Sequence, residues 1–340
     1  MSDFSKTIHV GLLAYGMSGK IFHAPFIDKH KGFNLYAITE RNTKKAQKEY
    51  PQLISYNSVD ELLNDAAIEL VIINTPNCLH YEHAKAALLK GKHILVEKPF
   101  TANRKQAEEL FKLADEQGKE VLVYQNRRWD SDYLSAKEVI ESGKLGKLNE
   151  VHIRYDRYRT AIGVKTFKEL PVEASGLQFD LGPHLLDHVI SLFGKPLSYR
   201  KVLGRNRKNT QVDDYFFTQM TYPNSLNVTV TASLLVPNPQ PAFILHGCEG
   251  TYMKHRTDIQ EEQLYKGIKP GDAGYGIEPP EKQGILTLID NDGVKTEHYI
   301  PSKPSNYLGL FDAVYQTIVF QKPYPIKREE ILTQLEILES

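Results

Sequence analysis

The sequence predicts an α/β protein in which a doubly wound parallel sheet is followed by a second, α+β domain built on a mostly antiparallel sheet. Apolar strands alternate with helix-period segments up to about residue 125. Beyond Lys147, alternating β-branched and aromatic runs dominate, which is typical of an antiparallel sheet. A chain of 340 residues also exceeds the size at which one core usually keeps growing. We therefore expect two domains, residues 1–126 and 127–340.

In the first domain, several of the expected helices carry start or stop residues. Ser58 precedes two acidic residues at the start of one helix, and Gly91 and Gly118 follow the ends of two others. The expected strands are Ile8–Ala14, Phe33–Thr39, Leu70–Asn74, His93–Val96 and Glu120–Tyr124. The expected helices are Lys20–Lys29, Thr43–Tyr50, Val59–Asn64, His80–Lys90 and Arg104–Gln117.

The second domain is expected to contain five strands, two helices and one long irregular loop. The loop, Lys266–Gln283, is rich in Gly and Pro and could cover a site. The strands are Val151–Tyr158, Tyr215–Tyr222, Asn227–Leu235, Phe243–Gly247 and Ile285–Ile289. The helices are Leu177–Phe193 and Tyr307–Phe320.

Composition excludes several classes of partner. Lys plus Arg equals Asp plus Glu at 42 each, so no global field steers the chain towards nucleic acid or an anionic membrane. No segment reaches the roughly 18 apolar residues of a membrane span, and Cys78 and Cys248 indicate a reduced compartment rather than a disulfide framework. We expect a cytoplasmic protein whose partner is a small molecule.

The first strand runs into a turn of small residues, Gly16-Met17-Ser18-Gly19, in which Ala14 replaces the first glycine of G-x-G-x-x-G. Such a turn brings backbone N–H groups close to a pyrophosphate at a helix N-terminus, so we expect dinucleotide binding. Glu40 ends the second strand, where a carboxylate accepts the ribose hydroxyls of NAD. Arg41 follows and could pair with a 2′-phosphate, so NADP stays open. The alternative is a turn used only for packing, with Glu40 as a solvated acid.

Two further strands end in polar or proline-bearing turns, at Asn74-Thr75-Pro76-Asn77 and Glu97-Lys98-Pro99. In a parallel sheet these turns line the carboxyl edge, where ligands bind. The ammonium of Lys98 can stabilise negative charge on a substrate oxygen, and proline fixes the turn at a bond where a cis peptide costs little. Alone, the tripeptide is equally consistent with a solvated surface pair.

Asp180 and His184 lie four residues apart, a spacing that places both on one face of a helix or of a turn entering one. Histidine is the natural base for an alcohol proton, and a carboxylate can orient it or hold the substrate hydroxyl. Asp187 and His188 are expected on the opposite, packing face. A metal site at His184, Asp187 and His188 is the alternative, but adjacent residues point apart on a helix, so we predict no metal.

These motifs together resemble the Gfo/Idh/MocA oxidoreductases, which include glucose-fructose oxidoreductase and inositol dehydrogenase. The resemblance covers essentially the whole chain, through the glycine turn, Thr75-Pro76-Asn77 with His80, Glu97-Lys98-Pro99, and Asp180 with His184 in G-x-x-x-D-x-G-x-H-x-x-D. The segments 125–130 and 156–159 look like the branch that contains NADP-dependent scyllo-inositol dehydrogenases. The implied fold is a Rossmann domain followed by a large open sheet.

The resemblance implies a catalytic group of Lys98, Asp180 and His184, with His184 as the acid/base. Asn126 and Trp129 are then expected near the nicotinamide, and Arg157 and Tyr158 in the substrate cavity. The full cofactor set is Gly16, Met17, Ser18, Gly19, Glu40, Arg41, Thr75, Asn77, His80, Glu97, Lys98, Asn126 and Trp129. The full substrate set is Lys98, Arg157, Tyr158, Asp180 and His184. Two residues depart from the family pattern: Ala14 stands where many members have glycine, and Glu40 stands where NADP users commonly lack an acid. Glu40 therefore slightly favours NAD.

Structural roles remain as alternatives for several of these residues. Asn126 could simply end a strand, Trp129 could pack in a core, and His80 could cap a helix. Tyr158 could face the sheet interior while Arg157 lies exposed on the other face.

The sequence therefore predicts an NAD(P)-dependent dehydrogenase acting on a CH–OH group of a polyol or sugar. One alternative is a reductase of another carbonyl or imine compound, as in the biliverdin reductase and dihydrodiol dehydrogenase members of the wider family. Another is a nucleotide-binding regulator without turnover. The resemblance also implies a homodimer or homotetramer.

Overall fold

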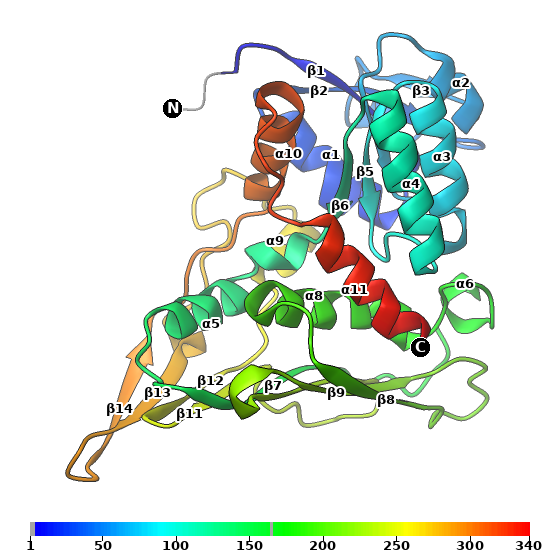
Figure 1. The fold of residues 1–340 in the computed structure, drawn as a ribbon. Helices are drawn as coiled ribbons and strands as arrows, with labels where there is room; N and C mark the ends of the chain where they lie inside the picture. Colours follow the sequence, from blue (N-terminus) through cyan, green and yellow to red (C-terminus); the bar gives the residue numbers. More distant parts are fainter. Residues whose placement is uncertain (1–3, 164–165) are drawn as a thin grey trace. The chain divides into compact units, whose positions relative to one another are not determined.

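A computed structural model describes residues 4–163 and 166–340 of the chain (Figure 1). The chain divides into two compact units, each assembled from three segments. Unit 1 consists of Met1–Asn126, Gln263–Tyr275 and Tyr307–Arg328, and unit 2 of Arg127–Glu262, Gly276–Asn306 and Glu329–Ser340. The first boundary falls after Asn126, but two later segments that the sequence assigned to the second domain cluster with unit 1.

Unit 1 contains the predicted doubly wound sheet, with six parallel strands in the order β3-β2-β1-β4-β5-β6. This order reverses direction at β1, and ligands of such sheets bind beyond the carboxyl ends of the strands at that reversal. The strands are β1 Ile8–Leu12, β2 Phe33–Thr39, β3 Ile54–Tyr56, β4 Leu70–Ile73, β5 His93–Glu97 and β6 Val121–Tyr124.

The helices of unit 1 follow the predicted alternation, and Ser58 caps one of them by accepting a hydrogen bond from the Glu61 amide (3.1 Å). They are α1 Ala24–Lys29, α2 Val59–Asn64, α3 His80–Leu89, α4 Arg104–Gln117 and α10 Leu308–Phe320, with short segments η1 Gly19–His23 (a π-helical turn), η2 Ala46–Lys48 and η3 Asn77–Leu79. Short helix α9, Ile259–Tyr265, spans the boundary between the units in sequence.

The helix expected at Thr43–Tyr50 is wrong, because the structure forms only the 3₁₀ turn Ala46–Lys48 there. The amides of Lys45 and Ala46 are bonded to the Glu40 carboxylate, and Pro51 disfavours a helical conformation at the residue before it.

The late segment containing α10 completes the core of unit 1. Phe311 stacks on Phe26 with ring centroids 5.7 Å apart, and Tyr315 meets Phe33 edge-on at the same distance. A Cβ on Gly32 would lie 2.4 Å from the Tyr315 ring, so glycine permits this close approach. The helix at 307–320 was predicted, but the sequence did not predict that it packs in unit 1, which contains the parallel sheet.

Unit 2 is built on an eight-stranded sheet in the order β14-β13-β12-β11-β7-β10-β9-β8. Its pairs are antiparallel apart from β7 with β10, as expected for a mostly antiparallel sheet. The strands are β7 Leu148–Asp156, β8 Ser198–Gly204, β9 Tyr215–Thr221, β10 Asn227–Ser233, β11 Phe243–Gly247, β12 Gly250–Lys254, β13 Gly284–Ile289 and β14 Lys295–Ile300.

Helices cover one face of this sheet, and the other face carries no helix in the part of unit 2 that is described (Figure 1). The alternation of β7 shows the two faces, since Val151, Ile153 and Tyr155 are buried while Glu150 and His152 are not. The helices are α5 Ser131–Glu141, α6 Thr166–Glu169, α7 Leu177–Asp180, α8 Gly182–Phe193 and α11 Arg328–Glu339, with short segments η4 Asn126–Trp129, η5 Pro223–Ser225 and η6 Pro280–Lys282.

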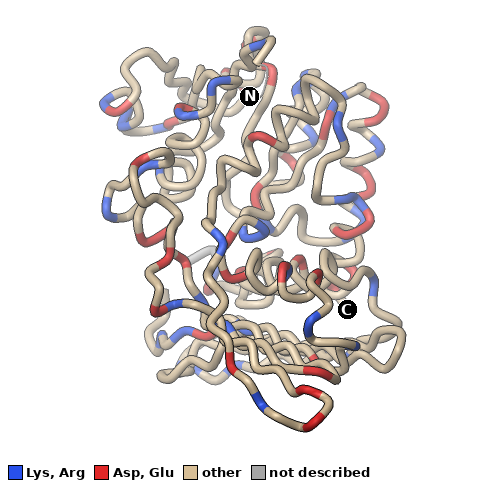
Figure 2. Tube along the Cα trace, turned by 90° about the vertical axis from the view of Figure 1, so that its left-hand side faces the viewer, with Lys and Arg blue, Asp and Glu red and all other residues tan. Residues whose placement is uncertain are grey.

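Charged residues of both signs are interspersed along the chain (Figure 2), consistent with the balance of acidic and basic residues in the sequence. Among the described residues, none of the helices is both long enough and apolar enough to cross a membrane.

Candidate functional site

The turn after β1 is held by a side chain from the neighbouring strand. Asn74, just after β4, accepts a hydrogen bond from the Ala14 amide (3.0 Å) and donates one to the Ala14 carbonyl (2.8 Å). A Cβ on Gly19 would lie 2.1 Å from that same carbonyl oxygen, so only glycine allows the helical segment to approach the turn this closely. The sequence predicted Gly19 as a cofactor residue and placed Asn74 in a turn at the carboxyl edge, but it did not predict that Asn74 holds the Ala14 turn.

Gly16 differs from Gly19, because a Cβ built on it would meet no atom within 4 Å. Its neighbours Met17 and Ser18 open a helical run whose first amides have no partner within the helix. Packing within unit 1 thus gives no reason for glycine at this position, whereas close approach of a ligand phosphate to the backbone does. The turn fits the pyrophosphate of a dinucleotide.

Glu40 does not present its carboxylate as the sequence predicted. The carboxylate accepts hydrogen bonds from the Lys45 amide (2.8 Å), the Ala46 amide (3.2 Å) and the Ser55 hydroxyl (3.1 Å). The residue is buried, so these bonds are largely shielded from water. The carboxylate is used within unit 1 to fold the loop after β2, and the argument from Glu40 to NAD loses its basis. The next residue, Arg41, is exposed.

The turns after β4 and β5 are joined through His80. Its Nδ1 lies 2.8 Å from the Pro99 carbonyl oxygen and its Nε2 lies 2.9 Å from the Thr75 carbonyl oxygen. Burial lowers the pKa of His80, against the raising effect of both carbonyls. These contacts favour the structural alternative for His80, which positions the two turns. The Thr75 hydroxyl contacts His83 Nδ1 at 3.0 Å, and Asn77, at the start of η3, is half-buried.

Glu97 and Lys98 stand at the carboxyl edge of the sheet, as predicted, and the Lys98–Pro99 peptide is cis. Glu97 Oε1 lies 2.9 Å from Nε2 of buried His23, a residue that sequence reasoning missed because it is 74 positions away. Burial alone would raise the pKa of Glu97, but the His23 hydrogen bond and nearby positive charge outweigh it and lower this pKa. Glu97 thereby supplies a fixed negative charge beside Lys98.

In unit 2, Asp180 and His184 do not lie on one continuous helix. Helix α7 ends at Asp180 and α8 begins at Gly182, so the single helix expected at Leu177–Phe193 is interrupted at Leu181. Pro183 explains the break, since it has no amide hydrogen for a bond back to the preceding turn. His184 is buried in the first turn of α8, and its amide donates to the Leu181 carbonyl at 3.2 Å.

Asp213 holds the start of α7 and so fixes the short helix that carries Asp180. Its Oδ2 accepts a hydrogen bond from the Gln178 amide at 2.6 Å. Gly176, the residue before α7, has a φ of +86°, and a Cβ there would lie 2.1 Å from Asp213 Oδ1. Burial raises the pKa of Asp213 to about 6.

Two cations face the Asp180 carboxylate. Lys168 Nζ forms an ion pair with Oδ1, and the Arg157 guanidinium lies 3.9 Å from Oδ2. Burial lowers the pKa of Arg157, partly opposed by Asp180. Arg157 is therefore on the covered side with Asp180, whereas Tyr158 is 61 % exposed, which excludes the sheet interior. Lys168, in the short helix α6, was missed, because no sequence spacing connects it to a carboxylate twelve residues later.

Asp187 and His188 have structural partners, as expected for the packing face. Asp187 makes a bidentate ion pair with Arg128 (2.7 and 2.8 Å), which also binds Glu330 at 2.8 Å. His188 stacks on Tyr133 with ring centroids 4.5 Å apart, and burial lowers its pKa far below the usual range. These contacts leave the alternative metal site at His184, Asp187 and His188 without support.

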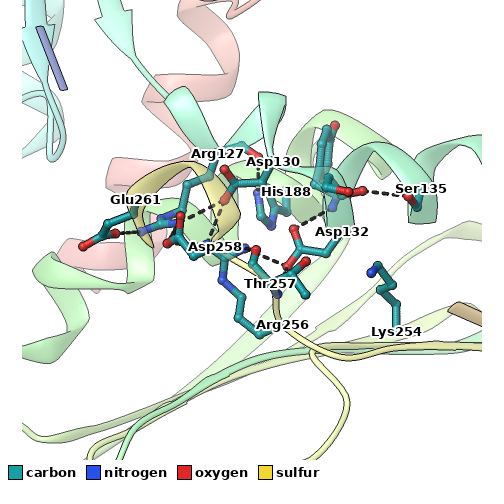
Figure 3. Close-up of polar contacts among 12 residues, drawn as sticks. Arg127, Asp130, Asp132, Ser135, His188, Lys254, Arg256, Thr257, Asp258 and Glu261 are labelled. Atoms are coloured by element: carbon teal, nitrogen blue, oxygen red, sulfur yellow. Dashed lines mark hydrogen bonds and ion pairs between the residues drawn. The ribbon is translucent and has the colours of Figure 1, made fainter. Parts of the chain in front are cut away.

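The segment after β6 is anchored in unit 2 by a buried ion network (Figure 3). Arg127 binds Asp130 at 3.0 Å and Asp258 at 2.6 Å, and Arg256 binds the same two carboxylates at 2.8 and 2.9 Å. Trp129, half-buried within η4, is held through its carbonyl by the Asn306 amide (3.3 Å). Asn126, buried at the start of η4, ends unit 1. The network fixes the backbone on which Trp129 stands.

Comparison with known proteins agrees with this architecture over the whole chain. Two models of one oxidoreductase family match, the NAD-binding Rossmann fold over residues 8–125 and the C-terminal alpha/beta domain over residues 137–340. The scyllo-inositol 2-dehydrogenase (NADP(+)) IolW of Bacillus subtilis is 36 % identical over 334 residues, covering 98 % of this chain and 92 % of that protein.

An uncharacterized oxidoreductase of Escherichia coli, YhhX, is 37 % identical over 335 residues, covering 98 % of this chain and 95 % of its own. A crystal structure of an oxidoreductase from Bacillus cereus superposes with a TM-score of 0.90 at 35 % identity, covering 98 % and 95 % of the two chains. The chain is a member of the Gfo/Idh/MocA oxidoreductase family, with its NAD-binding Rossmann domain and its C-terminal α/β domain.

Proposed function

We propose that this protein is an NADP(H)-dependent dehydrogenase that oxidises a secondary alcohol of a polyol or sugar and reduces the corresponding ketone. The observation that carries the proposal is the carboxyl edge of the parallel sheet in unit 1. There a glycine turn with room for a phosphate, and Lys98 beside a negatively charged Glu97, follow strands of one sheet. The similarity to a scyllo-inositol 2-dehydrogenase supports the substrate class.

The cofactor would be held by the turn at Gly16, Met17, Ser18 and Gly19 and by Arg41, Thr75 and Asn77. Arg41 is exposed and follows a carboxylate that is bonded to its own loop, so a cation rather than an acid is available near the end of β2. This arrangement favours a 2′-phosphate over a free ribose hydroxyl. When bound, the nicotinamide exchanges a hydride with the substrate carbon.

The protein's own residues would handle the proton and the charge on oxygen. His184 takes the proton of the substrate hydroxyl, and the Lys98 ammonium stabilises the negative charge that develops on that oxygen. Asp180 orients His184 or the hydroxyl, and Lys168 and Arg157 hold its carboxylate. Arg157 and Tyr158 contribute to substrate binding. No metal is required for these steps.

A turnover assay with inositols and aldoses tests the catalytic group. Lys98→Met and His184→Ala should each lower kcat by about 10²–10⁴-fold while NADPH binding, followed by fluorescence, is retained. Lys105→Met and His298→Ala, at exposed positions on α4 and β14, serve as controls and should leave kcat unchanged. Unchanged turnover in both catalytic variants would exclude the mechanism. Turnover only with enones or imines would support the alternative of a reductase. Cofactor binding without any turnover would support the alternative of a nucleotide-binding regulator.

Titration with both cofactors tests the NADP assignment separately. A hydrogen bond from a guanidinium to a phosphate contributes about 1.5–3 kcal/mol, or about 10–150-fold in affinity. Arg41→Ala should therefore weaken NADP binding by about that factor and leave NAD binding unchanged. Equal losses for the two cofactors would show that Arg41 does not contact the 2′-phosphate.

We also propose a homodimer or homotetramer assembled on the face of the eight-stranded sheet that lacks helices in unit 2. Light scattering on the purified protein measures the assembly directly, and a monomer at micromolar concentration would overturn this proposal.

A further inference from the structure

The uncovered face of the sheet in unit 2 carries a group of three residues that the proposed reaction does not use. Glu150 and His152 lie on β7 and His246 lies on β11, which pairs antiparallel with β7. Glu150 and His246 are direct partners in the register, and His152 is two residues along β7 on the same face. One ligand atom from each of the three lies within 4.8 Å of the others. Within the described part of the chain, no other group of His, Cys, Asp and Glu of this size is as close.

Both histidines are oriented by a threonine hydroxyl from a neighbouring strand. His152 Nδ1 lies 2.7 Å from Thr229 Oγ1 on β10, and His246 Nδ1 lies 2.9 Å from Thr251 Oγ1 on β12. When Nδ1 donates its hydrogen to the hydroxyl, the tautomer is fixed with a lone pair on Nε2. Nearly all metal-binding histidines are held by such an outer hydrogen bond. The Nε2 atom of His152 lies 2.9 Å from Glu150 Oε1, a contact that needs a hydrogen on Nε2 when no ion is bound. A metal ion would take the place of that hydrogen and would be bound by both Nε2 and the carboxylate oxygen.

Two imidazoles and one carboxylate with open positions match the donor set of zinc sites that retain a water molecule. Ligand atoms bound at about 2.0–2.2 Å in a tetrahedron lie about 3.4 Å apart. The ligand atoms here lie within 4.8 Å of one another, so each pair needs to close by at most about 1.4 Å. The other charges on this stretch of β7 are already paired, since Arg154 binds Asp156 at 2.8 Å. The positive charge of Arg154 is therefore balanced by Asp156 and does not oppose the binding of a metal ion.

We propose that Glu150, His152 and His246 bind one divalent transition-metal ion, Zn²⁺ in the first instance, on the uncovered face of the sheet. The ion connects the adjacent strands β7 and β11 and keeps a coordination position for water or another donor. The site is separate from the residues proposed for the oxidoreductase reaction, so its failure would leave that reaction unaffected. It lies on the sheet face proposed above for assembly, so metal uptake and oligomeric state are measured on the same sample.

The test uses tag-free, full-length protein that has been treated with a chelator and then equilibrated with Zn²⁺. Wild type should take up one equivalent that survives gel filtration, and Co²⁺ in place of Zn²⁺ should give the visible absorption of a four-coordinate ion. His152→Ala and His246→Ala should each lower the affinity by about 100-fold or more, beyond the 10–100-fold typical of an outer-shell loss. His298→Ala removes another strand histidine bonded to a threonine and should have no effect.

A second pair of variants separates a built site from loose surface binding and also serves if a histidine variant fails to fold. Thr251→Val removes the hydroxyl that orients His246 and should weaken binding by about 10-fold. Thr287→Val is the control: it changes the register partner of Thr251 on β13 and should leave metal binding unchanged. No uptake by wild type, or equal uptake by wild type and the two histidine variants, would overturn the proposal. Equal affinities for Thr251→Val and wild type would refute the orienting role of the threonine.

Discussion

Replacing Glu40 separates a structural role for this carboxylate from a role in choosing the cofactor. The carboxylate accepts bonds from the Lys45 amide (2.8 Å), the Ala46 amide (3.2 Å) and the Ser55 hydroxyl (3.1 Å). Hydrogen bonds to a charged group contribute about 1.5–3 kcal/mol each, and their effects on one group are not additive. The amide of Ala46 is buried and would lose its partner, whereas the Ser55 hydroxyl can turn to water.

We therefore expect Glu40→Ala to lower the free energy of unfolding by about 2–4 kcal/mol, with a fall in Tm of about 5–15 °C. Glu40→Gln retains one acceptor oxygen and should recover more than half of this loss. Glu49→Ala is the matched control, because Glu49 pairs with Lys20 at an exposed position and such pairs contribute less than about 1 kcal/mol. Thermal unfolding without cofactor measures all three variants.

The cofactor measurement is made on Glu40→Gln, whose loop should remain folded. Its ratio of Kd values for NADP and NAD should stay within about threefold of wild type, since the carboxylate faces its own loop. A change of tenfold or more in this ratio in favour of NADP, with an unchanged Tm, would show that the carboxylate contacts the ribose. It would refute a purely structural role for Glu40.

Three further perturbations follow from the contacts described. Gly19→Ala places a Cβ 2.1 Å from the Ala14 carbonyl oxygen, so we expect a loss of NADPH affinity above about 100-fold or a fall in Tm, and wild-type values of both would contradict the packing argument. Lys168→Met removes a cation from Asp180 and should lower kcat/KM by about 10–100-fold. Lys195→Met, at an exposed ion pair, is the control and should leave kcat/KM unchanged. Equal kcat/KM values for Lys168→Met and wild type would show that Lys168 has no role in turnover. Asp213 has a folded pKa of about 6, above its unfolded value of about 3.9, so folding favours its protonated form. Wild type should lose about 2 kcal/mol relative to Asp213→Asn as the pH rises from 4 to 7.5. A constant difference in unfolding free energy between the two proteins across that window would refute this.

The architecture was predictable because its signals are local and repeated. Each strand of the parallel sheet that was predicted is an apolar run of ordinary length followed by a helical segment, and the change of pattern after Lys147 separates the two kinds of sheet. Shorter or polar elements were missed. Strand β14 is exposed at five of its six residues, so it shows no buried face to be recognised. The placement of α10 against Phe26 and Phe33 depends on contacts across almost 300 residues, which no local pattern encodes.

The candidate site was less predictable where a side chain had two possible partners. The sequence places Glu40 at the end of a strand, where a ribose and the amides of the following loop compete for the same carboxylate. The sequence does not show which partner is nearer. In the structure the amides of the loop donate hydrogen bonds to the Glu40 carboxylate. The same argument applies to Asp180 and Lys168, and to Glu97 and His23. Residue type and position predicted where charge would be found, whereas the partner that fixes each charge is set by tertiary contacts, and those contacts decide which charges remain for a ligand.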